Sequence, residues 1–224
     1  TEAAAIAAVK AVPGARVLVV FAGNDRPSNL PNALRAIGAH VDAYDTQMGG
    51  PSHNVLMPSV ARRIREAVRS GEYTHVFMAP PCKSYSCAHD TPLRRRDDGV
   101  AVDGLPPHLA ELVQRDDSIL AFVAAVALIA HTRGVPFTIE NPPDRGDESS
   151  DAWWPLKRDH CPIWRMPSMR ILPDVTGARQ ATFPPCASGA DVQHATTLRT
   201  TASSEHGTVD EMACTQAGEA ARAW

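Results

Sequence analysis

The stretch THVFMAPPCKSYSCAHDTPLRRR, residues 74–96, decides the fold and raises the question of function. Its apolar beginning, residues 74–80, is typical of a buried strand. Pro80 and Pro81 end the strand, because proline donates no hydrogen bond to a sheet ladder. Cys82 comes directly after them, so the strand presents a thiol at its carboxyl end. Such a cysteine is either a nucleophile or a buried structural thiol, and buried cysteines are common.

Three more short apolar runs predict strands, and the segments between them have the periodicity of helices. Strands that alternate with helices build a parallel sheet covered on both faces, so we expect an α/β protein. The expected strands are 15–23, 39–45, 74–80 and 135–143, and the expected helices are 1–12, 30–38, 59–71 and 107–134, the last broken near Asp116 and Asp117.

The chain has 224 residues, of which 44% are hydrophobic, and this suits one domain with a substantial core. The regular pattern fades after residue 143. We therefore expect one domain over 1–224, with a core at 15–143 and an irregular part at 144–224 that completes the fold without a target-recognition domain. In that part we expect anchors at Trp153, Trp154 and Trp164, a strand within 194–201 and a closing helix at 211–224.

Charge and cysteine content narrow the function classes. The net charge is −3, so any nucleic-acid binding must use local basic patches. The five cysteines are odd in number and form no CxxC pair, which argues against a disulfide framework and favours an intracellular location. The longest apolar run, residues 119–130, is shorter than a membrane span and predicts a buried helix, so no membrane partner is expected.

Four residues of special chemistry fall at expected strand ends: Gly23, Asp45, Cys82 and Glu140. Open α/β sheets bind ligands beyond the carboxyl ends of their strands. Asp45 can accept hydrogen bonds from ribose hydroxyls, although a surface turn explains the same pattern. The loop FAGNDRPSN at 21–29 has one glycine and no GxGxxG motif, so a cofactor without phosphates fits better.

Glu140 closes the apolar run FTIENPP at residues 137–143. Partial desolvation there raises the pKa of a carboxyl and lets it donate a proton, whereas the alternative is an ordinary turn acid. Lys83 and Arg94–Arg96 can supply the positive potential that favours a thiolate at Cys82.

Three segments together resemble the DNA (cytosine-5)-methyltransferases: FAG at 21–23, APPCKSYS at 79–86 and IENPP at 139–143. The resemblance covers about residues 15–143, and 21–45 is also similar to methyltransferase-like domains in mobile elements of protists and algae. Pro81, Cys82 and Ser86 match the family's Pro-Cys-Gln-x-Phe-Ser loop with Lys83 and Tyr85 as replacements, and Glu140 and Asn141 match its Glu-Asn-Val strand end with Pro142 in place of Val.

The resemblance implies a Rossmann-like fold that binds S-adenosyl-L-methionine, and transfer of a methyl group to C5 of cytosine in DNA. Cys82 would attack C6 and Glu140 would act at N3 of a flipped-out base, in a nuclear or nucleoid-associated protein. It assigns Phe21, Ala22, Gly23, Asp45, Asn54 and Pro80 to the cofactor and Pro81, Ser86 and Asn141 to the DNA, and leaves Arg170 or Arg199 for the family's Gln-x-Arg-x-Arg arginine. Arg94, Arg95 and Arg96 follow the loop of Cys82 and can contact phosphate, although a solvated run of charge explains them equally well.

Three other interpretations stay open. The first is a methyltransferase-like module that binds nucleic acid or a partner without turnover. The second is a thiol nucleophile acting on another group, such as an acyl carbon, with His89 as the nearest histidine. The third is a structural zinc site, whose candidate ligands match no standard spacing and are Cys161, Cys186, Cys214, His160, His194 and His206.

Overall fold

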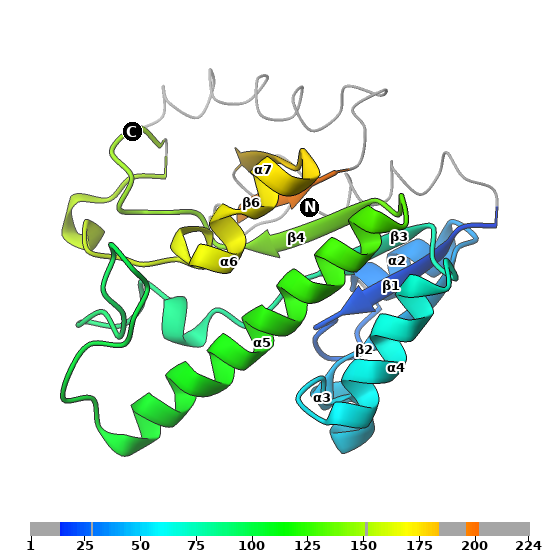
Figure 1. The fold of residues 1–224 in the computed structure, drawn as a ribbon, viewed down its shortest axis with the longest axis horizontal. Helices are drawn as coiled ribbons and strands as arrows, with labels where there is room; N and C mark the ends of the chain where they lie inside the picture. The colour runs from blue at the N-terminus through cyan, green and yellow to red at the C-terminus, as the bar shows by residue number, and fades with distance from the viewer. Residues whose placement is uncertain (1–13, 28, 151, 184–195, 202–224) are drawn as a thin grey trace.

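The computed structural model describes residues 14–27, 29–150, 152–183 and 196–201 (Figure 1). In this part of the chain one six-stranded sheet has the strand order β2-β1-β3-β4-β6-β5. The first four strands along the chain are parallel, whereas β6 runs antiparallel to both of its neighbours. The strands are β1 (Arg16–Val20), β2 (His40–Tyr44), β3 (His75–Met78), β4 (Phe137–Asn141), β5 (Arg179–Phe183) and β6 (Thr196–Thr200).

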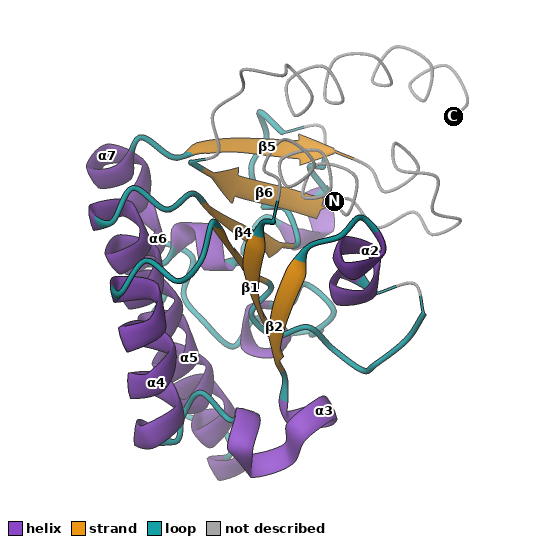
Figure 2. Cartoon of the chain, turned by 90° about the vertical axis from the view of Figure 1, so that its right-hand side faces the viewer, coloured by secondary structure: helices purple, strands orange, loops and turns teal. Residues whose placement is uncertain are grey.

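Helices cover both faces of the sheet (Figure 2). One face packs against the long helices α4 and α5, and the other carries α2. The helices are α2 (Leu30–Ala36), α3 (Thr46–Gly49), α4 (Pro58–Arg69), α5 (Pro107–Thr132), α6 (Pro167–Arg170) and α7 (Leu172–Thr176), and the 3-10 turns are η1 (Gly50–His53), η2 (Lys83–Tyr85), η3 (Pro155–Lys157) and η4 (Ile163–Arg165).

The apolar pattern of each central element explains its place. β3 is buried along its whole length, as a strand covered on both faces must be. α4 places Val60, Ile64 and Val68 in the core at helical spacing, and its arginines lie mostly outward. The apolar run 119–130 forms the second half of α5 and supplies much of the larger core, as expected.

The α/β class with a mostly parallel sheet is confirmed. The strand expected within 194–201 is β6, whereas β5, α3, α6 and α7 were not individually predicted. The break expected near Asp116 and Asp117 is wrong, because α5 runs unbroken from Pro107 to Thr132. The helices expected at 1–12 and 211–224 lie outside the described residues.

The expectation for the tryptophans is confirmed for one of the three. Trp164 is 5% exposed and donates a hydrogen bond from Nε1 to the carbonyl of Pro142 at 2.8 Å. Trp153 and Trp154 are 41% and 43% exposed, so the prediction that they are buried anchors is wrong. Among the described helices, none has both the length and the apolar character required to cross a bilayer.

Candidate active site

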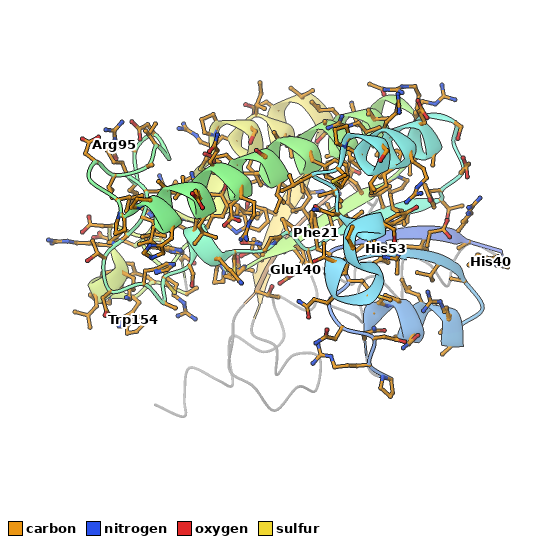
Figure 3. The ribbon with its side chains drawn as sticks, turned by 90° about the horizontal axis from the view of Figure 1, so that it is seen from below. Phe21, His40, His53, Arg95, Glu140 and Trp154 are labelled. Carbon is orange, nitrogen blue, oxygen red and sulfur yellow. The ribbon has the colours of Figure 1, made fainter. Side chains whose placement is uncertain are left out.

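The strand order reverses between β1 and β3, because β2 lies beyond β1 on one side and β4 beyond β3 on the other. In doubly wound sheets, ligands bind at this switch point, outside the carboxyl ends of the strands. Phe21 follows β1, Cys82 lies four residues after β3, and Glu140 is the penultimate residue of β4. Figure 3 shows Phe21, His53 and Glu140 near the middle of the molecule, away from His40 at the start of β2. The sheet therefore gathers the predicted residues at one edge.

Cys82 lies in a loop that is held from both sides. Before it, the buried side chain of Asn141 donates from Nδ2 to the carbonyl of Pro80 at 2.8 Å. After it, the backbone N–H of Ser84 donates to Oδ2 of Asp116 at 2.9 Å. Cys82 itself is partly exposed and immediately precedes η2. The loop thus offers an accessible thiol on a fixed backbone.

The surroundings of Cys82 disfavour the thiolate form of its side chain in the free protein. Burial is the main cause that raises its pKa, while a hydrogen bond from its own backbone opposes the shift. The negative charges of Glu140, Asp116 and Cys87 raise the pKa further. Glu140 and Cys82 are therefore electrostatic neighbours across the ends of β4 and β3.

The Glu140 carboxyl is partly buried and has a hydrogen-bond partner at the strand end. Burial raises the pKa of this carboxyl above its usual range, and a hydrogen bond donated by the hydroxyl of Thr196 offsets part of the shift. Thr196 begins β6, which pairs antiparallel with β4. A carboxyl in this state can keep a proton nearer to neutral pH and donate it to a bound base.

The loop after β1 has unusual backbone geometry. Phe21 has a φ of 64°, a left-handed conformation that is strained for a bulky residue, and Gly23 has a φ of 72°. The N–H of Phe21 donates to the carbonyl of Tyr44 at 2.7 Å, so the loop is attached to the end of β2. A side chain added at Gly23 would meet no atom within 4 Å, so space is open there.

Asp45 performs a structural task at this edge. One carboxylate oxygen accepts the N–H of Gly23 at 2.9 Å, and the other accepts the N–H of Gln47 at 2.8 Å and caps α3. Only the remaining lone pairs of Asp45 are available for a ribose. Asn54 is also used locally, because its Oδ1 accepts the N–H of Leu56 at 3.0 Å.

Sequence reasoning missed an aromatic pair beside Asp45. The rings of Tyr44 and His53 are tilted by 46° with centroids 5.1 Å apart, and Nδ1 of His53 lies 3.5 Å from the backbone nitrogen of Asp45. Gly49 makes room for this arrangement, since a Cβ there would lie 2.3 Å from the His53 ring. The available signal in the sequence was the pair Gly49–Gly50 with His53 three residues after it.

The predicted phosphate contact of Arg94 is wrong. Its side chain is 1% exposed and pairs with Asp117 at 2.8 Å, while its donors also reach the carbonyls of Gly99 and Val113. A buried guanidinium with these partners does not reach a nucleic acid. Arg94 is a structural residue of the loop that carries Cys82.

Its two neighbours are also paired, to different extents. Arg95 is exposed and pairs with Asp98 at 2.6 Å, so it remains accessible to a ligand. Arg96 is mostly buried and holds Asp144 through two hydrogen bonds of 2.8 and 3.0 Å. The structure therefore directs Arg96 toward the protein, although the sequence predicted a contact with DNA.

The two candidates for the arginine that the resemblance implies lie in different surroundings, and Arg199 pairs with Ile139 of β4, next to Glu140. Arg199 is 6% exposed and bonds to the carbonyl of Met169 and the side chain of Gln180. Burial lowers its pKa to about 10. Arg170 is exposed at the end of α6.

The remaining predicted contacts are adjacent to the thiol. Pro81 and Ser86 are partly buried on either side of η2, and the hydroxyl of Ser86 accepts the N–H of Ala88 at 3.0 Å. Nε2 of His89 lies 2.8 Å from the carbonyl of Lys83, to which it donates, so it is not positioned as a base for Cys82.

No group of three or more metal-binding side chains occurs in the described ranges. His160 and Cys161 are buried there, and burial raises the pKa of Cys161 to about 11. The other zinc candidates, Cys186, Cys214, His194 and His206, lie outside the described residues.

Comparison of the chain with protein-family models, with curated proteins and with solved structures finds no match. The residues at the carboxyl ends of the strands, Cys82 and Glu140 among them, are therefore the features of this chain that indicate a function.

Proposed function

We propose that this protein transfers a methyl group from S-adenosyl-L-methionine to C5 of cytosine in DNA through a covalent adduct at Cys82. The observation that carries the proposal is the pairing of an accessible thiol after β3 with a desolvated carboxyl at the end of β4, beside the switch point of the sheet. Both residue types and their order along the chain agree with the resemblance in sequence.

The residues after β1 and β2 fit a nucleoside cofactor that lacks a pyrophosphate. Space is open beside Gly23, and the loop has no run of glycines for close approach to phosphates. Phe21, Ala22 and Pro80 would border the methionine portion, and Asp45 would accept from the ribose with the lone pairs not used by the backbone. When bound, the cofactor supplies an electrophilic methyl group.

Cys82 and Glu140 would divide the chemistry of the base between them. As the Cys82 sulfur bonds to C6, its thiol proton would pass to water and the Glu140 carboxyl would donate its proton to N3, so the negative charge that develops on the ring is neutralised. C5 would then take the methyl group, and S-adenosyl-L-homocysteine would leave. Loss of the C5 proton to water and return of the N3 proton to Glu140 would break the bond between sulfur and C6, and the sulfur would regain a proton from water. The raised pKa of Glu140 favours the protonated form that the first step requires.

A binding module without turnover is the competing function. It is favoured by Asp45, whose two oxygens already accept backbone N–H groups, and by the inward pairing of Arg94 and Arg96. These features reduce the contacts available to a cofactor and to DNA. The two functions differ in whether a covalent intermediate forms.

The test is trapping of that intermediate. The protein is incubated with S-adenosyl-L-methionine and duplex DNA that contains 5-fluorocytosine, which cannot lose a proton from C5. We expect a covalent protein–DNA band with the wild type and with Cys87→Ala, a matched thiol five residues away, and none with Cys82→Ala. Absence of the band together with no cofactor binding by calorimetry would contradict the enzyme and favour the binding module.

A further inference from the structure

A buried carboxylate from α5 lies under the loop that carries Cys82. Asp116 is 1% exposed, and its Oδ2 accepts the backbone N–H of Ser84 at 2.9 Å. Its other oxygen lies 3.1 Å from the guanidinium of Arg115. Removing a carboxylate from water is unfavourable unless hydrogen bonds and charges compensate it, so a contact to the second residue after the thiol is a specific feature.

Further buried groups fix the same turn. Arg94 donates to the hydroxyl of Ser84 at 3.1 Å and lies with its guanidinium carbon 4.1 Å from the ring centre of Tyr85. Nε2 of His160 donates to the carbonyl of Tyr85 at 2.6 Å. The turn after Cys82 is therefore attached to α5 and to the segment around His160 by groups that water does not reach.

We propose that Asp116 is a positioning residue for Cys82, because its hydrogen bond to the Ser84 N–H holds the turn that directs the thiol toward the edge of the sheet. The importance of this role rests on the proposed function, in which Cys82 is the nucleophile, but the contact itself does not. A second observation agrees: the charge of Asp116 is one of those that raise the pKa of Cys82, after burial and Glu140.

Two variants separate the hydrogen bond from the charge. Asp116→Asn keeps a side-chain oxygen that can accept the Ser84 N–H but has no charge, whereas Asp116→Ala removes both. Glu111→Gln removes a charge from an exposed position of the same helix and is the control. All three are compared with the wild-type chain, and circular dichroism checks that each is folded.

Hydrogen exchange measures the contact. We expect the Ser84 amide to exchange roughly ten-fold faster in Asp116→Ala, the effect of losing one hydrogen bond, and to remain protected in Asp116→Asn and Glu111→Gln. Unchanged protection of the Ser84 amide in folded Asp116→Ala would overturn the proposed hydrogen bond.

Alkylation by iodoacetamide, followed at Cys82 by peptide mapping over a range of pH, measures the effect on the thiol. The charged groups that act on the pKa of Cys82 are Glu140 from β4, Asp116 from α5 and Cys87 from its own loop. We expect the midpoint to move to lower pH in Asp116→Asn and to stay in place in Glu111→Gln.

An unchanged midpoint in Asp116→Asn would overturn the action of the Asp116 charge on the thiol, since a merely structural residue does not shift the titration of the thiol. If Asp116→Ala does not fold, Asp116→Asn still decides through the same midpoint. Neither measurement needs cofactor or DNA. Both can therefore succeed while the trapping experiment fails, and the two failures are distinguishable.

Discussion

Arg94→Met is the change that most directly tests the assignment of this arginine to the interior. Arg94 reaches the hydroxyl of Ser84 and the carbonyls of Gly99 and Val113, and it pairs with Asp117. Methionine has a similar length and no donor. The variant therefore keeps most of the packing while it removes every one of these polar contacts.

The expected loss follows from the groups that stay behind. The carbonyl of Gly99 lies in a buried residue, and a buried acceptor left without a donor costs about 1–3 kcal/mol, whereas the carbonyl of Val113 keeps its helical position in α5. Breaking a buried ion pair typically costs about 3–5 kcal/mol. Asp117 is half exposed and is rehydrated, which argues for the middle of the range. We therefore expect a loss of about 3–5 kcal/mol, or roughly 6–20 °C in Tm for a chain of this size.

Urea unfolding followed by circular dichroism measures this loss, with Arg95→Met as the control. Arg95 is the next residue, has the same chemistry and is exposed, so its replacement should leave the unfolding midpoint nearly unchanged. The reasoning is refuted if Arg94→Met loses less than about 1 kcal/mol or if the two variants behave alike, because Arg94 would then be an ordinary surface cation.

Three further predictions concern pH and the loop. Glu140 has a raised pKa, so the folded chain binds more protons than the unfolded chain above pH about 4.3, and this carboxyl destabilises the fold as the pH rises. Glu140→Gln should therefore gain stability relative to the wild type as the pH is raised from 4 to 8, measured by urea titrations. An equal difference in unfolding free energy between the two proteins at pH 4 and pH 8 would contradict the shift. Burial lowers the pKa of His75 to about 4, so the unfolded chain binds an extra proton between pH 6.5 and 4. The free energy of unfolding should therefore decrease by up to about 3 kcal/mol as the pH is lowered from 6.5 to 4. His75→Gln should abolish that loss while the exposed His40→Gln retains it, as measured by unfolding at pH 5 and pH 7. Asn141→Ala leaves the carbonyl of Pro80 without its side-chain donor, so we expect a loss of about 1–3 kcal/mol by the same assay; a loss near zero would show that the contact does not form.

The sequence was sufficient to predict the parallel part of the sheet because its signals are local. Each of the four parallel strands lies within an expected apolar run, and a glycine or prolines close three of those runs, whereas Asp45 closes the fourth. The position of Cys82 and Glu140 at one edge followed from the rule that parallel strands share the direction of their ends. β5 was expected only as one of the short strands that residues 170–200 could supply, because the run RQATF alternates weakly and gains its place by pairing with β6.

The partners of the charged residues could not be predicted in the same way. Asp116 and Asp117 looked like a break in a helix, whereas they hold Ser84 and Arg94, residues more than 20 positions away. The run Arg94–Arg96 looked like a uniform basic patch, yet each arginine points into a different environment. These outcomes depend on which loop lies over which helix, and no local pattern in the sequence encodes that.

The supports on either side of Cys82 have a consequence for how this loop can change over time. Asn141 bonds to the carbonyl of Pro80, and Asp116 bonds to the amide of Ser84, so both bind the main chain of the loop. A contact to the main chain of the loop does not depend on which side chains the loop carries. The exposed Lys83 can therefore be exchanged freely while the thiol keeps its direction. A library of variants at this one position would place different side chains beside the thiol on an unaltered scaffold.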